Sequence, residues 1–259
     1  MKAQRRHELK QNSLIATLQQ LPTTIKQYQS QIALVVVVIA LAVVVIRYKI
    51  NSAAERLAEA QASLGIAGDD LSRLRQTVPN PRDDSKAIMQ EREMLYSEGI
   101  KEADDALEKA PLSKESLRAQ TLLTKGDLNF EVANAPELPG AATEPSLRPS
   151  ESDQQLLDDA YEAYSQVVQN YPSQTSDVTQ ARFGLGAVAE DRAVLNGGSD
   201  PAQWAAAKQQ FQAVLDSDAP AGFKNLAGQQ MQLLPQLQRP LMTELSAPSS
   251  QPSAQPTKK

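Results

Sequence analysis

The 259-residue sequence contains no cysteine, one histidine and few aromatic residues, which make up 4% of the chain. Without cysteine the chain forms no disulfide, no thiolate metal site and no cysteine nucleophile. The single histidine, His7, lies in a basic N-terminal tail and has no second imidazole with which to share a metal. Contact with solvent or with lipid headgroups is the expected role of His7, and no catalytic histidine remains.

Recognisable catalytic motifs are missing as well. The chain has no nucleophile elbow, phosphate loop, dinucleotide fingerprint or H-E-x-x-H zinc motif. Pairs of acidic residues offer acid/base or cation-binding groups, but near helix starts they favour the helix N-terminus or a solvated face. We therefore predict no enzyme, no cofactor and no metal, and keep an enzyme that uses acidic pairs as the alternative. The pairs are Asp69 and Asp70, Asp83 and Asp84, Asp104 and Asp105, and Asp158 and Asp159.

The chain also lacks an excess of positive charge, since its formal net charge is -5. Nucleic-acid binding normally needs a clustered cationic surface, so nucleic acid is not an expected partner. Strand-forming patterns are nearly absent, whereas Ala, Leu, Gln, Glu and Lys are abundant and lose little side-chain freedom in helices. The predicted fold class is all-α.

One long apolar run stands out near the N-terminus. Residues Ile32 to Ile46 contain no polar side chain, Gly or Pro. As a helix this run is about 22 Å long, which is short of the roughly 30 Å hydrocarbon core of a bilayer. Extension to residues 30–49 brings it close to spanning length, and a transmembrane helix is predicted there. The flanking residues able to anchor it at the headgroups are Lys26, Arg47, Tyr48 and Lys49.

The apolar run has two other interpretations. A buried core strand or helix is disfavoured because nothing downstream is apolar enough to surround it. A cleaved signal peptide has a much shorter basic region before its apolar run, and no small-residue cleavage site follows Ile46. Residues 1–29 carry more Lys and Arg than the segment after the run, which predicts a cytoplasmic N-terminus. The large domain is then periplasmic, at a bacterial inner membrane.

Residues 50–82 are predicted to form a helical stalk or hairpin. Ile50, Leu57, Leu64 and Leu71 recur every seven residues, a pattern able to drive a homodimeric coiled coil. Glycines at positions 65 and 68 interrupt the pattern, so a hairpin that turns near them is the preferred interpretation.

The remaining chain divides into a helical domain, 83–245, and a tail, 246–259, whose Pro, Ser and Gln composition predicts disorder. A helix capped by Asp83 or Asp84 is predicted to run to Pro111, and the next helix from Ser113 to near Asn134. Residues 135–153 carry no periodicity and are predicted to be an exposed, flexible insert. Residues 222–234 are predicted to form a terminal capping helix.

The domain contains a repeated pattern of small, aromatic and proline residues. Ala160, Tyr164 and Pro172 match Ala207, Phe211 and Pro220, and a fainter copy contains Ala103, Ala106 and Pro111. Helices between these copies carry Gly126 and Gly186. This alternation resembles the tetratricopeptide repeat (TPR) family, although the spacing is longer and the family's usual tryptophan is missing. Inserts at 135–153 and 195–200 account for much of the added length.

The resemblance implies a TPR-like α-solenoid of antiparallel helix pairs. Small residues such as Ala160 and Gly186 would let helices approach closely, and Tyr164 and Phe211 would fill the hole between successive pairs. Prolines would end each second helix. Trp204 is expected to pack against neighbouring helices rather than to contact a ligand.

The layout of basic tail, single anchor and repeat domain resembles bacterial single-pass helper proteins of the Sec translocon and related periplasmic repeat proteins. That resemblance implies a membrane-anchored scaffold for protein–protein interaction, acting beside a membrane complex in envelope assembly or protein translocation. The alternative is a homodimeric structural envelope protein held together by a coiled coil next to the membrane.

Overall fold

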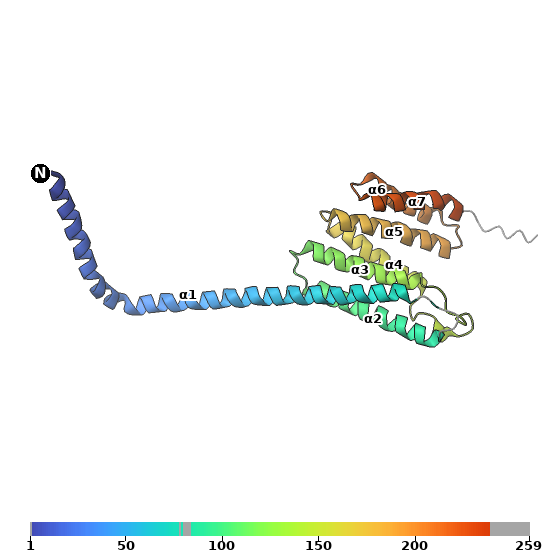
Figure 1. Ribbon diagram of the computed structural model, residues 1–259, viewed down its shortest axis with the longest axis horizontal. Helices are drawn as coiled ribbons and strands as arrows, with labels where there is room; N and C mark the ends of the chain where they lie inside the picture. The colour runs from blue at the N-terminus through green and yellow to red at the C-terminus, as the bar shows by residue number, and fades with distance from the viewer. Residues whose placement is uncertain (1, 78, 80–83, 239–259) are drawn as a thin grey trace, which may run out of the picture. The chain divides into compact units, whose positions relative to one another are not determined.

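The computed structural model describes residues 2–77, 79 and 84–238, and side chains from residue 33 onward except residue 36. Every regular element in these ranges is helical, which confirms the all-α prediction (Figure 1). Asp83, the side chain of Lys26 and the predicted tail 246–259 lie outside the described residues. The helices are α1 (Lys2–Gln76), α2 (Ser85–Lys109), α3 (Glu115–Ala133), the short 3₁₀ helix η1 (Pro145–Leu147), α4 (Asp153–Asn170), α5 (Thr175–Leu195), α6 (Pro201–Asp216) and α7 (Ala221–Leu237).

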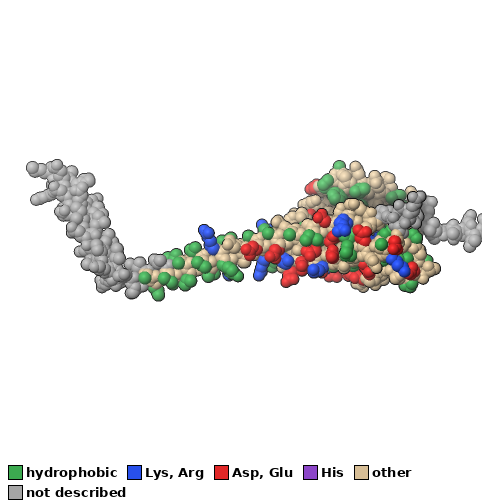
Figure 2. All heavy atoms as spheres, turned by 60° about the horizontal axis from the view of Figure 1, so that its bottom comes forward, with side chains coloured by type: hydrophobic (Ala, Val, Ile, Leu, Met, Phe, Trp, Pro, Cys, Tyr) green, Lys and Arg blue, Asp and Glu red, His purple; other side chains and the backbone are tan. Residues whose placement is uncertain are grey.

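The first of two compact units, Met1–Arg56, contains the apolar run. From Ala33 onward α1 is long and apolar enough to cross a membrane, and none of its most apolar stretch is buried. The large apolar side chains described between Leu34 and Ile46 are 51% to 67% exposed (Figure 2). A continuous exposed apolar surface of this kind marks a membrane or protein contact in a folded protein.

The second unit, Leu57–Lys259, begins well before the predicted boundary at residue 83. The end of α1 belongs to this unit because one of its faces is buried, with Ala60 and Ala67 fully inaccessible and Leu71 and Leu74 nearly so. Packing within the chain therefore explains the C-terminal end of the heptad pattern, where Leu71 is buried. Leu57 and Leu64 are partly buried, and Ile50 is 62% exposed.

The predicted hairpin near residues 65 to 70 is wrong, because α1 continues through both glycines to Gln76. A glycine in a helix interior costs roughly 1 kcal/mol relative to Ala. Burial of a leucine side chain gains about 1.5–3 kcal/mol, so the buried leucines Leu71 and Leu74 outweigh the glycines.

The helices of the second unit form a stack in which each helix from α2 to α7 packs against the next one along the chain (Figure 1). Alternate helices also touch, α3 with α5 and α5 with α7. Separate apolar clusters lie between α3, α4 and α5, between α5, α6 and α7, and between α1, α2, α3 and α4. Separate apolar clusters between neighbouring helices therefore stabilise the stack along its length.

The helix ends follow local signals. The Asp84 side chain accepts a hydrogen bond from the backbone N–H of Lys86 at 3.0 Å, which confirms its predicted cap of α2. The start of α3 at Glu115, two residues after the predicted Ser113, is a small shift. The helix expected at 222–234 is α7, which ends slightly later. Trp204 packs in the α5–α7 cluster as expected, and its indole N–H donates to the Gly198 carbonyl at 2.9 Å.

Residues 135–153 are mostly exposed, as predicted, but three apolar side chains anchor the segment on α2. Leu138, Ala141 and Leu147 are buried and pack with Met89 of α2. The segment also carries η1, and its Glu144 pairs with Lys86 at 2.7 Å. Three apolar side chains without helical or strand periodicity are enough to fix the segment against α2, and such packing argues against a flexible insert.

Candidate functional site

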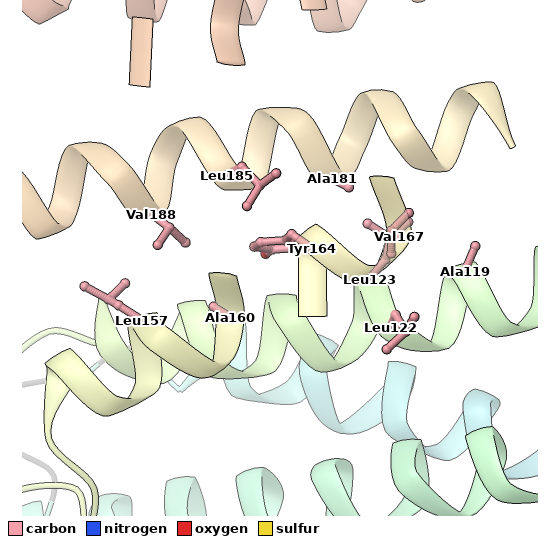
Figure 3. Close-up of a cluster of buried hydrophobic side chains, with 10 residues drawn as sticks. All are labelled: Ala119, Leu122, Leu123, Leu157, Ala160, Tyr164, Val167, Ala181, Leu185 and Val188. Carbon is pink, nitrogen blue, oxygen red and sulfur yellow. The ribbon is translucent and has the colours of Figure 1, made fainter. Parts of the chain in front are cut away.

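Two close helix junctions in the middle of the stack use an aromatic ring and glycines. At the first, which we call the Tyr164 junction, the Tyr164 ring of α4 lies in the apolar cluster labelled in Figure 3. The ring contacts Gly126 of α3 and Gly184 of α5. A Cβ at either glycine would lie 2.6 Å from a ring carbon, closer than real Cβ atoms approach. Both glycines are therefore required by space.

The second, the Phe211 junction, places the Phe211 ring of α6 against Gly186 of α5. A Cβ on Gly186 would lie 2.6 Å from Cε1 of Phe211. The neighbouring Phe183 ring packs on Phe211 with centroids 5.4 Å apart and planes tilted by 58°, an arrangement aromatic pairs favour.

A polar network extends from the Tyr164 junction toward α1. The Tyr164 hydroxyl donates to Asp127 Oδ1 at 2.7 Å, and Arg75 Nη2 approaches Asp127 Oδ2 at 3.3 Å. Burial raises the pKa of the Asp127 carboxyl, while the Tyr164 hydroxyl and Arg75 act in the opposite direction. Arg75 also pairs with Glu131 at 3.1 Å. These groups connect α1, α3 and α4.

The residues predicted for repeat packing occupy the helix contacts, not a binding site. Ala103, Ala106, Ala160 and Ala207 are fully inaccessible, and Tyr164 and Phe211 nearly so. Pro111, Pro172 and Pro220 each follow the end of a helix. Sequence reasoning missed Gly184, although the run Phe183–Gly186 contains two glycines and the structure has two rings to accommodate.

The predicted membrane-flanking residues Arg47, Tyr48 and Lys49 are exposed, and Tyr48 is 75% exposed. This exposure leaves them free to contact headgroups.

One member of each acidic pair packs or bonds within the fold, as Asp84 does at the cap of α2. Asp104 pairs with Lys125 at 2.6 Å, and Asp158 pairs with Arg192. Asp70 is buried against α2. No group of three or more His, Asp or Glu side chains in the described part of the chain is placed to hold a metal.

A hollow in the described surface lies between α2, the end of α3, the segment 134–153 and the start of α4; we call it the α2–α4 hollow. Its volume is about 760 Å³, within the range of roughly 300–1,000 Å³ seen for ligand sites. Its floor is lined by apolar side chains of two clusters, which are themselves at most 7% exposed, namely Met89, Val132, Leu138, Leu147 and Leu156. A smaller hollow of about 280 Å³ continues from it between α2, α3 and α4.

Arg92 of α2 holds one wall of the α2–α4 hollow in place. Its Nη1 donates to the Pro136 carbonyl and its Nη2 to the Thr77 carbonyl, each at 2.9 Å. These bonds satisfy backbone groups beyond the ends of α1 and α3, where no helical partner exists. The wall is therefore built by a buried guanidinium and is not a loose loop.

Tyr96 and Glu151 line both hollows. The Tyr96 hydroxyl lies 2.8 Å from Asn129 Oδ1 and 3.2 Å from Glu151 Oε2. Burial, followed by the Glu151 charge, raises the pKa of the Tyr96 hydroxyl, so Tyr96 stays neutral, with its one proton facing the nearer Asn129 oxygen and the Glu151 carboxylate.

The α2–α4 hollow was not foreseen from the sequence, because it needs α2, α4 and the 135–153 segment to come together. Comparison with protein-family models, with curated proteins and with solved structures finds no match. Function is therefore inferred from the residues of this chain alone.

Proposed function

We propose that this chain is a single-pass membrane protein whose TPR-like second unit binds a segment of a partner protein beside a membrane complex. The observation that carries the proposal is the α2–α4 hollow, which joins an apolar floor to polar walls in a stack of helices. Helical-repeat proteins bind partners on surfaces made by successive helices. The exposed apolar stretch of α1 supports the membrane anchor.

The TPR-like assignment is supported by the packing of the stack. Consecutive helices are neighbours, alternate helices touch, and aromatic rings enter gaps made by glycines. We further propose that the anchor lies in a bacterial inner membrane, with the second unit in the periplasm, serving envelope assembly or translocation. The homodimeric alternative has less support, because Ala60, Ala67, Leu71 and Leu74 are buried within one chain.

Site-specific photo-cross-linking tests the binding surface. A photoreactive amino acid at Glu93 or Ser150, which line the hollow, is expected to give adducts with the same partner in cells. The matched positions Gln169 and Gln209 are exposed and do not line either hollow, so no such adduct is expected there. The same adducts at all four positions, or none at Glu93 and Ser150, would contradict the proposal.

Sidedness is tested separately, using the absence of cysteine. Single cysteines replace Ser13 and Leu112, the latter 81% exposed, and intact cells are treated with a membrane-impermeant maleimide. Labelling at position 112 alone is the expected result. Labelling at position 13 alone would place the second unit in the cytoplasm.

A further inference from the structure

The α2–α4 hollow is lined by carboxylates that have no ionic partner. Glu93, Glu137, Glu151 and Asp153 reach its surface. None of the four forms an ion pair with another side chain of the described ranges. A cleft with an excess of one sign of charge and low-dielectric walls concentrates the electrostatic potential and attracts the opposite charge.

Two arginines also line this hollow. Arg92 donates to two backbone carbonyls, and Arg148 Nε donates to the Ala141 carbonyl at 3.0 Å. These hydrogen bonds fix the walls, while both guanidinium groups keep their positive charge. The lining retains more carboxylates than cations, four against two.

The smaller hollow is also lined by carboxylates, which lie on or just before α4. Asp159 and Glu162 line it together with Glu151. Lys125 also lines it, but its ammonium pairs with Asp104 at 2.6 Å. Ile100, Leu107 and Leu122 also line this hollow. The two hollows therefore present acidic side chains and an apolar floor in succession.

We propose that the α2–α4 hollow accepts a partner segment in which Lys or Arg side chains lie next to apolar side chains. The apolar groups would cover the floor near Met89 and Leu147, and the cations would meet Glu93 and Glu151. Charge complementarity selects this occupant, since an acidic segment would face the unpaired carboxylates at a cost. This inference rests on the proposed function, because it assumes that the hollow is the binding surface.

A defined peptide tests the inference on the full-length protein in a neutral detergent. The probe is fluorescent Gly-Leu-Lys-Leu-Arg-Leu-Gly, compared with one peptide in which Lys and Arg become Gln and another in which Leu becomes Ser. We expect the probe to bind at least about tenfold more tightly than either comparison peptide, a difference of about 1.4 kcal/mol. Added salt should weaken its binding, because the partly exposed charges are screened.

Matched variants locate the site. The double variant Glu93→Gln, Glu151→Gln should weaken probe binding about tenfold or more. The control Glu55→Gln, Glu108→Gln removes the same charge from exposed positions outside both hollows and should bind like the parent chain. Equal binding of probe and Gln peptide, or equal weakening by both double variants, would overturn the inference.

The proposed function and the inferred preference for basic segments are contradicted by different results. If cross-links form at Glu93 and Ser150 but the Gln peptide binds as well as the probe, the hollow is a binding surface without the inferred preference. If the cross-links are also absent, both proposals are overturned. Circular dichroism of each variant confirms that its helices are retained.

Discussion

Helices approach closely both in the middle of the stack and at its beginning, but different side chains fill the contact. Aromatic rings pack on glycines in the middle, whereas a leucine packs on a glycine at the beginning. Tyr164 and Phe211 enter gaps that glycines leave open, with no space for one more carbon. At the beginning, Leu128 of α3 packs on Gly99 of α2, where an added Cβ would meet it at 3.0 Å. A flexible aliphatic end adjusts to such a contact more easily than a clamped ring does.

The beginning of the stack also includes polar groups that fit less well. Asp70 is 4% exposed, and its Oδ2 has no hydrogen-bond partner among the described groups. The ion pairs there, including Arg73 with Glu91 and Lys109 with Glu59, join exposed side chains, and such pairs contribute about 0–1 kcal/mol each. The comparison teaches that rigid rings fix the middle of the stack by shape, while the beginning relies on an aliphatic contact that can adjust.

The largest effect is expected when the clamped ring is disturbed. Gly184→Ala places a Cβ 2.6 Å from Cε2 of Tyr164, and Gly126 on the other side prevents the ring from moving away. We expect the free energy of unfolding to fall by about 3 kcal/mol, the upper part of the usual range for overpacking. Urea unfolding of the full chain in detergent, followed by circular dichroism, measures the change.

Gly68→Ala is the matched control for this substitution. Gly68 also lies in a helix, but a Cβ there would meet nothing within 4 Å. The substitution should raise the free energy of unfolding by up to about 1 kcal/mol, because alanine favours helices. Equal destabilisation by both substitutions would contradict the role assigned to the Tyr164 junction.

The second prediction concerns the Tyr164 hydroxyl, a polar group that the Phe211 junction lacks. Tyr164→Phe deletes the 2.7 Å hydrogen bond to Asp127, leaving a buried carboxylate with one partner fewer. We expect a loss of about 2 kcal/mol in the free energy of unfolding. Tyr161→Phe is the control, since the Tyr161 side chain is 45% exposed, and its effect should stay within about 0.5 kcal/mol. An equal loss in both variants would show that the Asp127 bond is unimportant.

At the first helix pair, removal of a charge should stabilise the chain. Burial raises the pKa of Asp70, followed by repulsion from Glu98, so Asp70→Asn removes a charge that the folded state disfavours. We expect a gain of about 1.5 kcal/mol near neutral pH. Asp69→Asn, at the exposed neighbouring position, should change stability little. A loss of stability in Asp70→Asn would show that Arg73 stabilises the carboxylate more than burial destabilises it.

The smallest effect concerns pH. Burial, and then the charge of Asp191, raises the pKa of Glu190 from 4.5 to about 7. The folded state therefore retains a proton that the unfolded state releases, and this stabilisation is complete below pH 4.5 and lost as pH rises through about 7. Glu190→Gln should flatten this part of the profile by about 1 kcal/mol after allowance for solvent screening. Thermal unfolding at several pH values measures it, and an unchanged profile would contradict the assignment.

The sequence revealed the helices of the stack and the rings between them, because the Ala, aromatic and Pro spacing is local. It did not reveal Gly184: residues two apart in a helix point to nearly opposite sides, so Gly184 serves Tyr164 while Gly186 serves Phe211. The α2–α4 hollow depends on contacts between distant segments, and no local pattern marks it. The packing of Leu138, Ala141 and Leu147 was not predicted, because the surrounding Pro and Ser residues are typical of an exposed loop.

The fluorescence of Trp204 reports on the packing of the C-terminal end of the stack. It is the single tryptophan of the chain and lies 5% exposed in the cluster between α5, α6 and α7. Its emission should shift to longer wavelength when this end of the stack is hydrated. Because the chain contains no cysteine, one introduced thiol can carry an energy acceptor at any chosen exposed residue. Opening of the far end and opening of the α2–α4 hollow can therefore be followed as separate signals in one molecule.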